Sequence, residues 1–176
     1  MQNLVTNSNT PTGWTATAST LPADGSITTP LGFPTMRVVE DNTTAVHLVF
    51  PLSSTLKVGR TYTCQAVVKK QSSARNFFVF AHSGGGVNQC WFDFSTGLRG
   101  TLGASVLRAG MEFLGNGFYL CWITFVQTNA FVPIFYPATS DGGGISFAGD
   151  NVSYYIIGDV QISESNGPAE FTRTTG

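Results

Sequence analysis

The sequence predicts an all-β protein, and three observations carry this prediction. Helical periodicity is nearly absent from the 176 residues, whereas glycine, serine, threonine and β-branched residues occur along the whole chain. Short apolar segments of strand length recur, and turn-forming residues separate them. Many short strands with almost no helix are typical of two packed sheets. The expected fold is therefore an antiparallel β-sandwich of the jelly-roll type.

The strands are predicted from apolar runs and alternation, in the order residues 35–40, 44–50, 61–69, 77–81, 88–94, 118–126, 131–136 and 152–162. Within 61–69, Tyr62, Cys64, Ala66 and Val68 should face inward. The run 77–81 is apolar on both faces, as expected of a central strand.

Short polar breaks predict how some of these strands are connected. Residues 41–43 and 127–129 suggest that each break joins two paired strands. Pro133 favours an edge or bulged strand, because proline cannot donate a ladder hydrogen bond. Residues 102–113 are the only stretch with any helical tendency, which Gly103 and Gly110 weaken.

Length and composition indicate a single domain over residues 1–176. Hydrophobic residues make up 42% of the chain, which is enough for a core without disulfide or metal staples. Charged residues make up only 11%, against roughly 25% in an average globular domain. The surface should therefore be rich in serine, threonine, asparagine and glycine, which suits packing into an assembly or contact with uncharged polar ligands.

Charge and hydropathy exclude several function classes. The net charge is −1 and no basic run exceeds Lys69-Lys70, so nucleic-acid binding is not expected. The longest apolar runs are far shorter than the ~20 residues that span a bilayer, so membrane insertion is not expected. We expect no signal peptide either, because the first residues lack a basic segment followed by an apolar one. Cys64, Cys90 and Cys121 each lie in an apolar run, which predicts buried thiols in a protein that folds in a reducing cytoplasm.

Several short motifs occur in a fixed order along the chain: Asn3–Ser8, Leu21–Gly25, Asp93–Gly97, Asn116–Tyr119 and Tyr155–Ile162. Together they resemble jelly-roll modules, similar to carbohydrate-binding modules and lectin-like sandwiches, that recur in bacteriophage tail fibres, tail spikes and head-decoration proteins. Phe118 and Ile157 stand where the family has tryptophan, and Leu120 where it has arginine. We interpret Phe118, Tyr119 and Ile157 as scaffold positions.

The resemblance implies a non-enzymatic module on the virion surface that binds host-surface glycans. Its partners would be other virion proteins and host polysaccharide, and relatives suggest a homotrimer. A capsid decoration or cement protein, which would stabilise the head without binding glycan, is the alternative. A small stand-alone decoration or fibre-tip protein is expected, since no fibrous repeat or coiled coil accompanies the module.

Catalytic signatures are missing from the sequence, so no enzyme is expected. His47 and His82 are the only histidines, and no hydrolase or phosphate-loop motif accompanies them. His47 lies within a predicted strand and His82 borders a glycine-rich loop. Carboxylate pairs such as Asp93 with Asp159 could arise between adjacent strands, yet nothing in the sequence selects one.

Glycan recognition uses aromatic faces for sugar rings and a few polar side chains for hydroxyl groups. Cys90, Phe92 and Phe94 are better core residues than their neighbours, so Trp91 and Asp93 are predicted to point outward. By the same alternation, four further side chains should point away from the core, namely Gln65, Tyr155, Asp159 and Gln161. His82 could add a ligand contact. The predicted glycan-binding residues are Trp91, Asp93, Gln65, Tyr155, Asp159, Gln161 and His82. The competing interpretation is that a second layer covers Trp91.

No cofactor is expected. A structural Ca²⁺ is a minor alternative, because the loop carboxylates Asp24, Asp141 and Asp150 are hard oxygen ligands, although no EF-hand spacing exists. The glycine-rich loops at 83–86 and 141–144 precede no helix, so they do not indicate a phosphate site.

Overall fold

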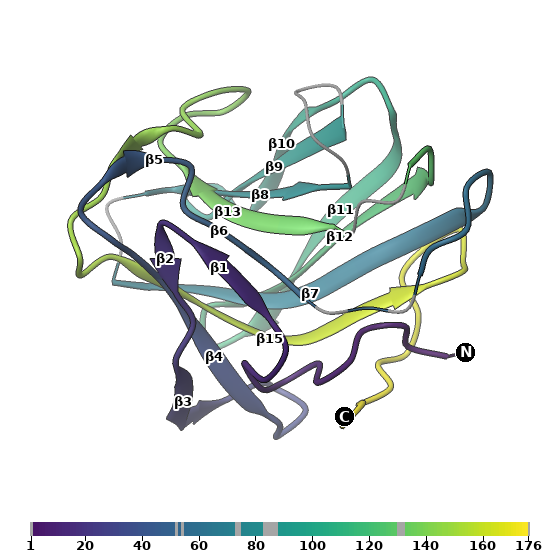
Figure 1. Ribbon diagram of the computed structural model, residues 1–176, viewed down its shortest axis with the longest axis horizontal. Helices are drawn as coiled ribbons and strands as arrows, with labels where there is room; N and C mark the ends of the chain where they lie inside the picture. The colour runs from purple at the N-terminus through teal and green to yellow at the C-terminus, as the bar shows by residue number, and fades with distance from the viewer. Residues whose placement is uncertain are drawn as a thin grey trace.

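The computed structural model describes residues 2–51, 53, 55–72, 75–82, 88–129 and 133–175, with the side chains of residues 71 and 72 left aside. Two antiparallel sheets face each other across one main core, and the described residues contain no α-helix (Figure 1). The predicted all-β sandwich is thus confirmed.

The six-stranded sheet contains most of the middle of the chain. Its spatial order is β1-β6-β13-β8-β9-β10. The strands are β1 (Thr15–Thr17), β6 (Leu48–Phe50), β13 (Ile134–Ala138), β8 (Phe77–Ala81), β9 (Gln89–Asp93) and β10 (Leu98–Leu102).

The seven-stranded sheet holds the longest strands. Its order is β11-β12-β7-β15-β4-β2, with β3 also pairing with β4. The strands are β11 (Val106–Gly115), β12 (Phe118–Val126), β7 (Thr61–Ser72), β15 (Tyr154–Ser163), β4 (Pro34–Glu40), β2 (Ser19–Thr20) and β3 (Ala23–Thr28). A small two-stranded sheet joins β14 (Phe147–Ala148) to β5 (Thr44–Ala45).

Side-chain alternation places the main core between the two sheets. In β7, Tyr62, Cys64, Ala66 and Val68 all point into it, as predicted. The central strand β8 serves two clusters. Phe78 and Phe80 belong to the main core, whereas its other side chains join a second cluster on the far face of the six-stranded sheet. This Trp91 cluster consists of Val79, Ala81, Trp91, Tyr136 and Ala138.

The predicted strand pairs across residues 41–43 and 127–129 are wrong. The chain leaves β4 in the seven-stranded sheet and reaches β6 in the six-stranded one, with β5 in the small sheet between them. It likewise passes from β12 in one sheet to β13 in the other. Alternation tells which side of a strand is apolar but not which strand lies beside it, so a short break looks the same in both cases. Residues 131 and 132 of the predicted strand 131–136 lie outside the described residues.

Strands at sheet edges escaped the sequence reasoning. β11 includes most of the stretch for which a helical turn was considered, and β1, β3 and β10 are largely exposed. An exposed edge strand needs no apolar face along its full length, so it lacks the alternation by which strands are found.

A β-bulge interrupts β15 between Gly158 and Gln161, where the pairing with β7 shifts by one residue. Asp159 lies there with φ +49°, the left-handed conformation that aspartate tolerates better than most residues. Before the bulge Tyr155 and Ile157 face the main core, and after it Val160 and Ile162 do so. The alternation of β15 therefore changes phase at this point.

The three cysteines are free and buried, in agreement with the sequence prediction. Burial raises the pKa of Cys90 to about 12, and it raises the pKa values of Cys64 and Cys121 as well. Their thiols therefore stay protonated and unreactive in the folded chain.

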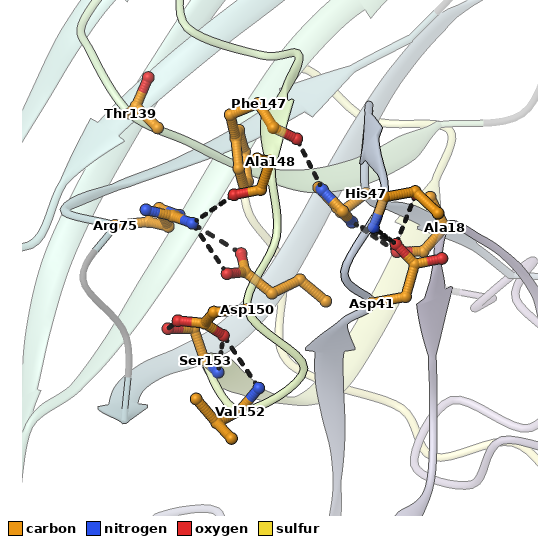
Figure 2. A network of polar contacts seen from close by, with 12 residues as sticks. Ala18, Asp41, His47, Arg75, Thr139, Phe147, Ala148, Asp150, Val152 and Ser153 are labelled. Atoms are coloured by element: carbon orange, nitrogen blue, oxygen red, sulfur yellow. Dashed lines mark hydrogen bonds and ion pairs between the residues drawn. The ribbon is translucent and has the colours of Figure 1, made fainter.

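A buried polar network fastens the small sheet to the rest of the fold (Figure 2). The His47 ring lies between the backbone oxygens of Ala18 and Phe147. Nearby, Arg75 donates to Glu40 at 3.0 Å and to the carbonyl of Ala148 at 3.0 Å. Burial raises the pKa of Glu40, and the guanidinium of Arg75 acts against that rise.

Gly149 should be the least replaceable glycine of this network. A Cβ at this position would lie 1.8 Å from the backbone oxygen of Asp41 and 2.8 Å from the His47 ring. We expect Gly149→Ala to lower the free energy of unfolding by about 1–3 kcal/mol, because the backbone of residue 41 must move. Urea unfolding measures this. Gly167→Ala is the control, since nothing lies within 4 Å of its Cβ position. Equal stability of the two variants would contradict the packing described here.

Candidate functional site

The predicted glycan-binding residues do not form one exposed patch. Trp91 and Asp93 lie on β9 in the six-stranded sheet, whereas Gln65 lies on β7 and Tyr155, Asp159 and Gln161 on β15 in the seven-stranded sheet. His82 follows β8. The two groups therefore belong to different sheets, and only Asp93 among them is not buried.

Trp91 points away from the main core, as predicted, but it is not exposed. Only 3% of its surface is accessible, because Val46, Leu48 and Ile145 pack on the Trp91 cluster. Its indole Nε1 donates to the carbonyl of Gly143 at 3.2 Å. The competing interpretation is therefore correct, since a second layer of side chains covers Trp91.

Asp93 caps the turn that follows β9. Its Oδ1 accepts from the backbone N–H of Ser95 at 2.8 Å and from the Ser95 hydroxyl at 2.6 Å, and its Oδ2 accepts from Thr96 at 3.0 Å. Partial burial acts to raise the pKa of Asp93, but these hydrogen bonds outweigh it and lower the pKa. The carboxylate thus holds the turn.

Tyr155 and His82 belong to the interior, so their predicted outward positions are wrong. Tyr155 faces the main core because the bulge lies after it, and its hydroxyl donates to the carbonyls of Arg75 and Phe77. The His82 ring stacks on Phe125 with centroids 4.4 Å apart. Burial lowers the pKa of His82 to about 4, so the ring is neutral at neutral pH.

The C-terminal segment, residues 164–175, lies across the outer face of the seven-stranded sheet. Gln65 donates to the carbonyl of Ala169 and accepts from its N–H, both at 2.9 Å. Gln161 donates to the carbonyl of Glu170 at 3.2 Å and accepts from the N–H of Thr172 at 2.7 Å. Both amides therefore bind this segment, and sequence reasoning missed that role.

A groove of about 250 Å³ remains between the C-terminal segment and the chain around residues 30–31. It opens over the outer face of the seven-stranded sheet, and its walls are mostly apolar. The lining residues are Pro30, Leu31, Gln65, Val67, Leu114, Leu120, Asp159, Ala169 and Phe171. Water occupies roughly 30 Å³ per molecule in the liquid, so the groove has space for a small ligand or part of a larger one.

Asp159 is the only carboxyl group among the described residues that line this groove. Its Oδ1 accepts from the side-chain amide of Asn9 at 2.7 Å, whereas its buried Oδ2 has no hydrogen-bond partner among the described residues. Burial raises the pKa of Asp159, and the side chains of Thr29 and Asn9 act against that rise. A buried acceptor without a partner is costly, but this oxygen is enclosed, so a ligand hydroxyl reaches it only if a neighbouring side chain moves.

The carboxylates considered for calcium hold turns and pairs instead. The hydrogen bond from Arg37 keeps the pKa of Asp24 at about 2, Asp141 accepts from the N–H of Thr101, and Asp150 accepts from Ser153. The described part of the chain contains no group of three or more histidine, cysteine, aspartate or glutamate side chains placed to hold a metal ion.

No described helix is long and apolar enough to cross a membrane.

Replacing the Asp159 carboxyl with an amide should stabilise the fold at neutral pH. A raised pKa means that the folded state binds the proton more tightly than the unfolded chain, whose ordinary value is 3.8. The protonated Asp159 carboxyl therefore contributes its full stabilisation below pH 3.8. This contribution is lost as the pH rises through the pKa of Asp159 in the folded state. We expect Asp159→Asn to raise the free energy of unfolding on the order of 1 kcal/mol at about pH 7, and the gain to vanish near about pH 3.

Urea unfolding at both pH values measures this difference. Asp93→Asn is the matched control, because its carboxylate has a lowered pKa and accepts hydrogen bonds in its charged form. That change should destabilise the fold at about pH 7. Two variants with the same sign of effect at that pH would refute this assignment of the two carboxyl groups.

Comparison with known proteins identifies structures with a similar fold. The sequence matches no protein-family model and no curated protein. Among solved structures, the xylan-binding domain CBM22-1 of Paenibacillus barcinonensis Xyn10C superimposes with a TM-score of 0.52 at 13% identity over 95% of both chains.

Two larger proteins contain a similar domain. The CBM22-1–GH10 modules of Clostridium thermocellum xylanase 10B, solved with xylohexaose, give a TM-score of 0.54 at 14% identity. The match covers 98% of this chain but 30% of that one. The enzymatically active domain of bacteriophage CBA120 tailspike protein 4 gives 0.50 at 10% identity, covering 92% of this chain and 21% of that one. The chain therefore has the β-sandwich fold of carbohydrate-binding modules and of a part of a phage tailspike.

Proposed function

We propose that this chain is a non-enzymatic glycan-binding module on the surface of a phage or phage-like particle, and that the groove beside Asp159 is its binding site. The observation that carries this proposal is the groove itself, whose mostly apolar walls also include the polar residues Gln65 and Asp159. Small-ligand sites typically combine apolar walls with a few placed polar groups.

A sugar ring matches both parts of the groove. Its C–H faces can pack on Leu31, Leu120 and Phe171, which line the groove. One of its hydroxyl groups can donate to Asp159 Oδ2 once a side-chain movement uncovers this buried oxygen. The second carboxylate that glycoside hydrolysis requires is absent from the described lining, which favours binding over turnover.

The fold supports this proposal from another direction. The similar domain of the Paenibacillus protein is named as xylan-binding, and the similar part of the phage protein belongs to a tailspike. A module with weak single-site affinity becomes effective when a particle presents many copies, because each bound copy raises the local concentration of the others. The free buried thiols fit folding in the bacterial cytoplasm before assembly.

The binding site is tested with a printed glycan array, followed by titration of the oligosaccharide that binds best. We expect Leu31→Ala to weaken that binding about fivefold, which corresponds to ~1 kcal/mol of lost apolar contact. Leu31 is 59% exposed, so its truncation should leave the fold intact. Val58→Ala is the control, because Val58 is 66% exposed and does not line the groove.

Two outcomes would overturn the proposal: no glycan on the array binds, or Leu31→Ala and Val58→Ala bind equally well. Electron microscopy of labelled particles then tests the location. Label on the tail supports adhesion, whereas regular label over the head together with a silent array supports the alternative of a capsid decoration protein.

A further inference from the structure

Strand β11 is a long strand at the edge of the seven-stranded sheet. Among the described residues it pairs only with β12. Natural edge strands are usually short, bulged, covered, or protected by proline or charged side chains. β11 has ten residues and no proline, and between register shifts at its two ends it keeps an unbroken register from Arg108 to Phe113, whose two charged residues, Arg108 and Glu112, are opposite in sign. This edge is therefore able to accept another strand.

The side chains of this edge have a defined arrangement. Ala109 and Met111 pack against the main core, whereas Arg108 and Glu112 lie opposite Thr124 and Leu120 on the outer face of the sheet. Arg108 and Glu112 are exposed, and no ion pair to either is found within the described residues. Between them lies Gly110, over which the Trp122 indole packs so closely that a Cβ would come within 2.7 Å of it.

The order of these residues makes the strand complementary to itself. In an antiparallel pair of identical strands related by a twofold axis at Gly110, Arg108 of each copy lies directly opposite Glu112 of the other. Opposite charges at directly opposed positions stabilise a strand pair, and like charges destabilise it. Centring the axis on Ala109 or Met111 instead places Arg108 or Glu112 opposite Gly110, so only the register at Gly110 forms both ion pairs.

Exposed apolar side chains extend this complementarity to the ends of the strand. Leu107 is 54% exposed and Phe113 is 60% exposed. The register centred on Gly110 brings Phe113 of one copy to the end of the strand where Leu107 of the other lies, next to the register shift between Val106 and Arg108. Burying large apolar side chains that water otherwise contacts favours association.

We propose that β11 pairs with β11 of a second copy of this chain, in an antiparallel register centred on Gly110. The partner is thus an identical molecule, and the seven-stranded sheets of the two copies become continuous. A twofold contact of this kind is closed, so it produces a dimer rather than the trimer that the family resemblance suggests.

Charge reversal tests both the pairing and its register, with sedimentation equilibrium of the full chain as the measurement. We expect the wild-type chain to dimerise. Arg108→Glu and Glu112→Arg should each raise the dimer dissociation constant at least tenfold, because each places two like-charged pairs across the twofold axis. The combined variant Arg108→Glu/Glu112→Arg should restore dimerisation, since every pair is again opposite in charge.

Arg99→Glu is the control, because Arg99 is an exposed arginine on the neighbouring edge strand β10 and takes no part in the proposed pairing. It should leave the dissociation constant unchanged. Thermal unfolding of each variant separates loss of dimer from loss of fold, and the combined variant identifies any folding defect of the single ones. A monomeric or trimeric wild-type chain, or a combined variant that stays as dissociated as the single variants, would overturn the proposal.

Discussion

The β-bulge in β15 is the constraint on which the two faces of the seven-stranded sheet depend. This strand lies between β4 and β7, and it must supply core side chains along its whole length. The extra residue at Asp159 lets Ile157 and Val160 both face the core although they are three positions apart. Gly158 and Asp159 consequently face outward, where a Cβ on Gly158 would lie 2.7 Å from Thr29. Residue 29 can approach this closely only because a glycine is there.

Both sheets are covered on their outer faces, and the two covers differ in chemistry. Apolar side chains cover the Trp91 cluster on the six-stranded sheet. On the seven-stranded sheet, paired hydrogen bonds from Gln65 and Gln161 hold the C-terminal segment. These side-chain amides satisfy backbone groups of the segment without introducing charge. The groove beside Asp159 is lined in part by this C-terminal segment.

Sequence reasoning predicted those features that follow from local alternation. The predictions were correct for the bounds of β8 and β12 and for the inward side chains of β7, because the residues within a strand indicate which of its faces are apolar. Strand partners were not predictable in this way, since sheet order depends on contacts that are remote in the sequence. Tyr155 was misplaced because a bulge of one residue reverses the expected face, and the composition of β15 does not reveal it.

The candidate site shows the same division. Gln65 and Asp159 were chosen correctly as side chains that leave the core, yet Gln65 binds a backbone segment 104 positions away. No sequence pattern within β7 predicts such a contact. Trp91 was oriented correctly, but its cover comes from segments around residues 46 and 145. A sequence thus reveals the direction of a side chain more readily than what lies above it.

The two ends of the chain meet at the same side of the molecule (Figure 1). The amide of Asn3 donates to the carbonyl of Thr172, and the hydroxyl of Thr174 donates to the carbonyl of Val5. These contacts join residues 169 positions apart, so Asn3 and Val5 cannot form them during synthesis until residues 172 and 174 have followed. At a synthesis rate of roughly 5–20 residues per second, the N-terminal segment waits on the order of ten seconds or longer for its partners. The contacts of Asn3 and Val5 therefore form only after residues 172 and 174 have been synthesised.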